Sequence, residues 1–124
     1  MLVFGNPIVS KDSIPLKIIG GLAARLPYIE FVEFDPNENL EDEGRELNII
    51  DTVDGAKKVV LITDIGMIRT SKLYSMHDFD LGYSLKLLKK LGYIDRVRIF
   101  GVPMRIKQRD ALEQLVTLIG ANLP

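Results

Sequence analysis

Three side chains suited to metal or acid–base chemistry follow the apolar runs of this sequence. They are Asp12, Asp64 and His77. Asp12 comes after the start MLVF and a Gly-Asn-Pro turn, Asp64 ends the run VVLIT, and His77 is the single histidine of the chain. Two carboxylates and one imidazole form an oxygen and nitrogen ligand set for a divalent metal. The same trio could also transfer protons as general acid and base.

Each of these residues also has a purely structural interpretation. Asp12 could cap the helix that follows it, and Asp64, which precedes Ile-Gly, could form a turn. A lone histidine such as His77 is more often a surface or helix-capping residue. The trio depends on the predicted topology and not on a motif of fixed spacing.

Composition excludes several other kinds of site. The 124 residues contain no cysteine, so disulfides, cysteine nucleophiles and thiolate metal sites are excluded. The net charge of −1 offers no basic field for nucleic acid. No apolar run approaches the length of a membrane span, and the start MLVFGNP does not resemble a signal peptide, so we expect a cytoplasmic protein that binds no membrane.

The familiar nucleotide and serine-hydrolase motifs are missing. The sequence has neither GxGxxG nor GxxxxGK[ST], which disfavours a small nucleotide-binding domain. It also has no GxSxG elbow. A carboxylate–histidine site is therefore the leading hypothesis from the residues alone.

Predicted strands and helices alternate along the chain. We expect strands at 1–4, 28–34, 57–66 and 95–103, helices at 14–26, 80–91 and 107–119, and an acidic loop with a short helix around 38–47. This order predicts one α/β domain over residues 1–124, a three-layer sandwich whose mostly parallel central sheet is covered by helices on both faces. The continuous apolar run in 57–66 predicts the central strand. Ligands bind such sheets outside the carboxyl ends of the strands.

The same residues carry a resemblance to the hydrogenase maturation endopeptidases. VFGNPIVSKDSIP resembles the family's opening, with Gly5 and Asn6 at its Gly-Asn pair and Asp12 at its acidic position six residues further on. VVLITDIG resembles the family's central strand and the carboxylate that ends it, at Asp64. YSMHDFDLGYSLKLL is similar to the family's histidine and following helix, at His77. VRIFGVP resembles its last core strand.

This resemblance implies an endopeptidase that removes the C-terminal extension of a nickel-loaded [NiFe] hydrogenase large-subunit precursor. Asp12, Asp64 and His77 would bind the nickel and carry the catalysis, while Asn6 and Asp35 would contact the substrate. The nickel would arrive with the precursor, and other divalent metals would also fit the ligand set.

The sequence departs from the family at several positions. Lys11 precedes the acidic position, Pro15 stands where the family has glycine, and Asp35 is followed by PNENLED in place of a Gly-Gly-Thr-like turn. The chain is also short for the family. These departures keep open an alternative function, a binding or accessory protein that has the same fold and cleaves nothing.

Overall fold

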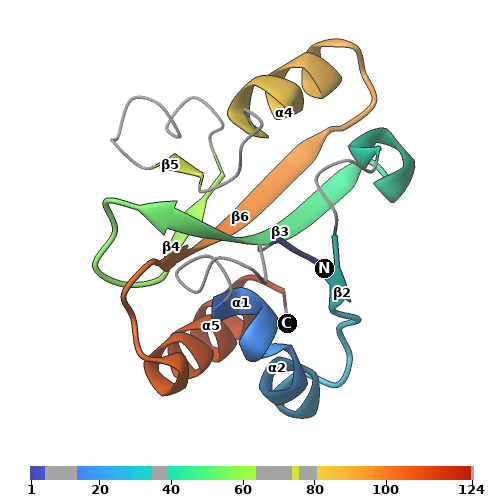
Figure 1. The fold of residues 1–124 in the computed structure, drawn as a ribbon. Coiled ribbons are helices and arrows are strands. Elements are labelled where there is room, and N and C mark those ends of the chain that lie inside the picture. The colour runs from blue at the N-terminus through green and yellow to red at the C-terminus, as the bar shows by residue number, and fades with distance from the viewer. Residues whose placement is uncertain (5–13, 35–38, 64–73, 76–80, 124) are drawn as a thin grey trace.

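The computed structural model describes residues 1–4, 14–34, 39–63, 74–75 and 81–123. Its strands are β1 (Leu2–Val3), β2 (Val32–Glu33), β3 (Glu46–Asp54), β4 (Val60–Ile62), β5 (Tyr74–Ser75) and β6 (Arg96–Pro103). Its helices are α1 (Ile14–Lys17), α2 (Ile19–Arg25), the 3-10 helix η2 (Leu40–Glu43), α4 (Leu81–Lys90) and α5 (Gln108–Asn122) (Figure 1).

The strands form one mixed, mostly parallel sheet. Its order is β2-β1-β3-β6-β4, and β5 pairs with the end of β3. The pairings of β1 with β2, β1 with β3 and β3 with β6 are parallel, whereas β4 and β5 run antiparallel to their partners. The longest pairing joins β3 and β6, from Glu46 opposite Arg96 to Val53 opposite Pro103. The predicted fold class is therefore confirmed for the sheet.

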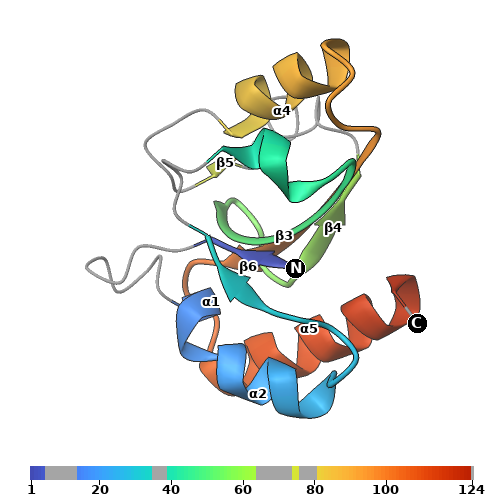
Figure 2. The ribbon, with the colours of Figure 1, turned by 90° about the vertical axis from the view of Figure 1, so that its right-hand side faces the viewer.

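Helices cover both faces of this sheet, as the sequence predicted (Figure 2). On one face, Leu85 of α4 and Leu40 of η2 pack with alternate residues of β3 such as Leu47 and Ile49. On the other face α1, α2 and α5 pack against the intervening residues, including Ile50 of β3. Side chains of a strand point alternately to the two faces, so β3 contributes to both cores.

The helices follow the predicted periodicity with local differences. The segment predicted as one helix over 14–26 is divided at Ile18 into α1 and α2. Within α2, a Cβ on Gly21 would lie 2.9 Å from Cδ2 of Leu112 in α5, so glycine allows the two helices to approach closely. The helix predicted over 80–91 ends as expected at Gly92, whose φ of 81° suits the left-handed turn after a helix.

The prediction that 57–66 forms the central strand is wrong. Its described strand, β4, stands at one end of the sheet order and runs antiparallel to β6. The central position belongs to β3, in a stretch whose first residues were predicted as part of the acidic loop. The residues of β4 are apolar because both faces of the strand are covered. Val60 packs in one core and Leu61 packs in the other.

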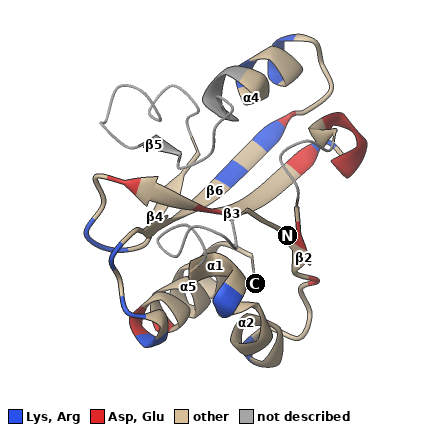
Figure 3. Cartoon of the chain, in the orientation of Figure 1, with Lys and Arg blue, Asp and Glu red and all other residues tan. Residues whose placement is uncertain are grey.

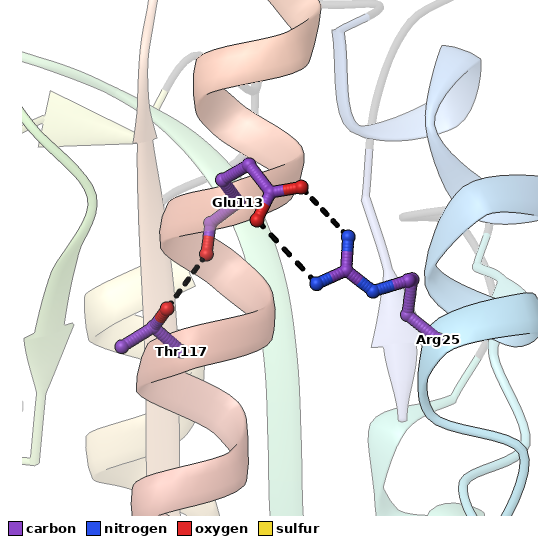
Figure 4. Close-up of polar contacts among 3 residues, drawn as sticks. All are labelled: Arg25, Glu113 and Thr117. Carbon is purple, nitrogen blue, oxygen red and sulfur yellow. Dashed lines mark hydrogen bonds and ion pairs between the residues drawn. The ribbon is translucent and has the colours of Figure 1, made fainter.

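Two exposed ion pairs tie elements that are far apart in the sequence. Arg25 of α2 binds both carboxylate oxygens of Glu113 in α5, at 2.7 and 3.4 Å, and Thr117 donates to the backbone oxygen of Glu113 (Figure 4). Arg45 and Asp95, which precede β3 and β6, make a similar bidentate pair with both distances at 2.8 Å.

Among the helices of the described part of the chain, none is both long and apolar enough to cross a membrane.

Candidate functional site

Within the described residues, one edge of β3 has a gap in its strand ladder beside Asp51 and Thr52. The other edge of β3 is occupied by β6 from Glu46 to Val53. The first edge pairs with β1 at Ile49 and Ile50, and with β5 at Val53 and Asp54. On this edge, between these pairings, no strand in the described ranges pairs with Asp51 or Thr52. The gap lies where β1 and β5 both end.

The two residues at the gap are the polar residues that the described structure buries. Asp51 and Thr52 are both 0% exposed. By strand alternation Asp51 shares the face of Ile49, toward α4, and Thr52 shares the face of Ile50, toward α1 and α5. A carboxylate buried in a fold is normally paired, hydrogen-bonded or bound to a metal. Its burial at the end of the parallel pairing with β1 makes Asp51 a candidate site residue.

The surroundings of Asp51 differ on its two sides. On the β1 side, the Phe4 amide donates to the Ile50 oxygen at 2.8 Å, and the Phe4 ring stacks on Phe34 with centroids 5.2 Å apart. On the β6 side, Asp51 is the register partner of Gly101, which has no side chain. The carboxylate thus lies between an aromatic pair and a glycine.

The gap coincides with the topological switch point of the sheet. The connection that leaves β1 contains α1 and α2, which pack on one face. The connection from β3 to its parallel neighbour β6 contains α4, which packs on the opposite face. Adjacent parallel strands whose connections go to opposite faces leave a crevice at their carboxyl ends, and this is where ligands bind in open α/β sheets. By this topology, Asp51 lies at the switch point between the carboxyl ends of β1 and β3.

The five predicted site residues, Asn6, Asp12, Asp35, Asp64 and His77, all lie outside the described residues. The described residues next to them are nevertheless informative. Segment 5–13, with Asn6 and Asp12, begins after Phe4, and segment 76–80, with His77, begins after Ser75. Phe4 and Ser75 are the two residues that border the gap beside Asp51. Asp35 follows Phe34, which stacks on Phe4.

The direction of β4 differs from the one expected for the strand before Asp64, whose role at the site stays a prediction. Val60 is opposite Gly101 and Ile62 is opposite Ile99, so β4 runs from the carboxyl end of β6 toward its amino end. The described chain before Asp64 therefore leads away from the edge where β1 and β3 end. The prediction had assumed a parallel strand, and that assumption is wrong.

Asp51 is the candidate that sequence reasoning missed. Two apolar runs in the chain are each followed by an acidic residue, LNIID at 47–51 and VVLITD at 59–64. The second run is the more strongly apolar and predicts the central strand, while the first lies beyond the acidic loop over 38–47 and is assigned to no predicted strand. The composition of the two runs does not distinguish them. Their positions in the sheet do, since only β3 lies between β1 and β6.

The described residues do not by themselves assemble a metal site. No group of three histidine, cysteine or acidic side chains within them is placed to hold a metal ion. Asp51 contributes one carboxylate at the gap, which can bind a cation, accept a proton or orient a water molecule. A complete ligand set would need residues from outside the described ranges.

The fold is that of known endopeptidases. No protein-family model matches this sequence, and no curated protein matches it. Among solved structures, an endopeptidase from Escherichia coli in solution is similar over 99% of this chain and 94% of its own, with a TM-score of 0.66 and 17% identity.

A second similar solved structure is that of a hydrogenase maturation protease. The crystal structure of a hydrogenase 3 maturation protease is similar over 94% of this chain and 85% of its own, with a TM-score of 0.59 and 21% identity. The resemblance to hydrogenase maturation endopeptidases is thereby confirmed at the level of the fold.

Proposed function

We propose that this protein is a maturation endopeptidase that removes the C-terminal extension of a nickel-loaded [NiFe] hydrogenase large-subunit precursor. The observation that carries the proposal is the position of Asp51, a fully buried carboxylate at the switch point of the sheet. The fold shared with two solved endopeptidases, one of them a hydrogenase maturation protease, supports the choice of reaction.

We assign to Asp51 the role that the sequence analysis predicted for Asp64. In this proposal Asp12, Asp51 and His77 form the group that recognises the nickel of the precursor. The support is that the segments carrying Asp12 and His77 start from Phe4 and Ser75, on either side of the gap beside Asp51. Asn6 and Asp35 remain proposed substrate contacts, since they follow Phe4 and Phe34, whose rings stack on each other.

Each residue has a defined task in the reaction. The carboxylates of Asp12 and Asp51 supply negative charge toward a divalent cation, and the His77 imidazole supplies a neutral nitrogen ligand. The nickel belongs to the substrate, and when bound it polarises a carbonyl or lowers the pKa of a water molecule. The burial of Asp51 keeps water from screening its charge, which strengthens its attraction for a cation.

A second candidate is an accessory protein that binds the precursor and cleaves nothing. The sequence after Asp35, which has PNENLED in place of the family's Gly-Gly-Thr-like turn, is the specific observation that favours it. This protein would use the same crevice to hold the precursor.

The test is a cleavage assay. Purified protein is incubated with a nickel-loaded large-subunit precursor, and mass spectrometry follows the mass of the precursor's C-terminal end. We expect a short tail to be lost only when the precursor contains nickel, and no loss with His77→Ala. Retained precursor binding without cleavage, in both wild type and His77→Ala, would favour the accessory protein and contradict the peptidase.

A further inference from the structure

We propose that a basic patch at the carboxyl end of β6 binds an acidic polypeptide segment. The patch consists of five exposed side chains from two connections and the start of α5: Lys57, Lys58, Arg105, Lys107 and Arg109. None of them belongs to the proposed catalytic group, and neither sequence motif nor fold assigns them a role.

The topology of the sheet brings these residues together. Because β6 lies between β3 and β4, the connection over 55–59 must pass the carboxyl end of β6. The connection over 104–107 leaves β6 at the same place. The backbone amide of Val59 donates to Oε1 of Gln114 at 2.8 Å, which fixes the first connection against α5. Figure 3 shows the basic segments of both connections on the same side of the molecule.

Within the described residues, none of the five cations of the patch forms an ion pair. Among the described residues, the cations that form ion pairs are Arg25 and Arg45, both outside the patch. No acidic side chain in the described ranges lies within ion-pair distance of the five patch residues. Asp54, close by in sequence, instead accepts from the Gly55 amide at 2.9 Å. Five cations that have no ion-pair partner among the described residues form a local field that attracts anions, although the net charge of the chain is −1.

An acidic peptide fits this patch better than nucleic acid does. The rest of the surface carries enough acidic residues to give the whole chain a pI near 5.8, including Glu41, Asp42 and Glu43 in η2. A long phosphate backbone would extend beyond the patch and meet this opposing charge. A short acidic segment can remain within the patch and pair its carboxylates with the lysines and arginines.

The patch lies at the same sheet edge as the gap beside Asp51. Val53, two residues after Asp51, is opposite Pro103, where the connection to Arg105 and Lys107 begins. A polypeptide lying in the crevice could therefore reach the patch with a neighbouring segment. The assignment of that segment to the substrate protein rests on the proposed peptidase function, whereas the affinity for an acidic peptide does not.

The experiment compares two triple variants of equal charge change. Lys57→Gln/Lys58→Gln/Lys107→Gln alters the patch, and Lys86→Gln/Lys89→Gln/Lys90→Gln alters three exposed lysines on α4. The probe is a fluorescein-labelled glutamate peptide, whose binding is followed by anisotropy. We expect the patch variant to bind about tenfold more weakly than wild type and the α4 variant to bind like wild type. Raising the salt concentration should weaken the wild-type interaction.

Two further measurements separate the possible partners. An oligothymidylate of equal charge should bind more weakly than the glutamate peptide, and tighter binding of the oligonucleotide would overturn the proposal in favour of nucleic acid. Equal losses of peptide affinity in both triple variants would also overturn it, because a net-charge effect would then suffice. In the cleavage assay, the patch variant should raise KM with little change in kcat. An unchanged KM beside weakened peptide binding would contradict the assignment to the substrate and leave the peptidase proposal intact.

Discussion

Asp51 and Gly101 are register partners in the parallel pairing of β3 and β6, so the buried carboxylate has a residue without a side chain beside it. The space over Gly101 is taken by Val53, the next residue after Asp51 on the same face. Asp51 of the proposed site is therefore next to the closely packed contact between Gly101 of β6 and Val53 of β3.

Replacing Gly101 with alanine should destabilise the protein. The new Cβ would lie 2.9 Å and 3.1 Å from the two Cγ atoms of Val53 and 3.2 Å from Cγ2 of Val60, inside the sheet. Overpacking of this kind costs about 1–3 kcal/mol, which urea denaturation would measure. Gly120→Ala is the control, since nothing lies within 4 Å of the added Cβ in α5. Glycine-to-alanine changes within helices stabilise by about 0.5–1 kcal/mol. Equal stability of Gly101→Ala and wild type would contradict the packing described here.

Replacing Thr52 with valine should stabilise the protein. Thr52 is 0% exposed, and its Oγ1 has no hydrogen-bond partner in the described part of the chain. Valine has nearly the same shape and removes an unsatisfied hydroxyl, so the free energy of unfolding should rise by about 1–2 kcal/mol. Thr117→Val, which loses an exposed 3.0 Å hydrogen bond to Glu113, should change it little. A clear loss of stability in Thr52→Val would show that the hydroxyl is satisfied, for example by an ordered water.

The Arg25–Glu113 pair should make part of the stability depend on pH. The hydrogen bond from Arg25, with its charge, lowers the pKa of the Glu113 carboxyl below its usual value. The folded pKa is thus lower than the unfolded one, so this stabilisation is present above the unfolded pKa and is lost as pH falls through the folded pKa. The urea midpoint of wild type should exceed that of Glu113→Gln at neutral pH.

That difference should be modest and should disappear in acid. The side chains of Arg25 and Glu113 are 47% and 57% exposed, so solvent weakens their interaction. The two midpoints should converge as the pH falls through the folded pKa of Glu113, because the carboxyl is then protonated in both states. In an Arg25→Gln background, the effect of Glu113→Gln should lose most of this pH dependence. If the difference between the two urea midpoints grew as the pH fell, the result would contradict this prediction.

The layers of this fold could be predicted from sequence because helical and strand periodicity record which faces are buried. The runs ending at Phe4 and Pro103 were read as strands, and Gly92 was read as the end of a helix; all three are confirmed. Strand order and direction could not be predicted in the same way. An apolar run that is covered on both faces has the same sequence pattern in a central parallel strand and in β4 at the sheet margin.

The same ambiguity explains the candidate site. The sequence signal for the site is a carboxylate after an apolar run, but the chain contains two such runs, ending at Asp51 and Asp64. Only the pairing of β3 between β1 and β6 distinguishes them, and that pairing depends on contacts between residues far apart in the sequence. The predicted roles of Asp12 and His77 stay predictions, now supported by the positions of Phe4 and Ser75.

The most direct test of the central claim compares Asp51→Asn with Asp64→Asn in the cleavage of a nickel-loaded precursor. Asparagine keeps the shape of aspartate and removes its charge, and circular dichroism would verify that both variants fold. We predict that Asp51→Asn lowers cleavage by at least about 100-fold, as expected when a buried charged group of an active site is lost, and that Asp64→Asn cleaves like wild type. Cleavage retained by Asp51→Asn and lost in Asp64→Asn would contradict the placement of the site at the β1–β3 crevice.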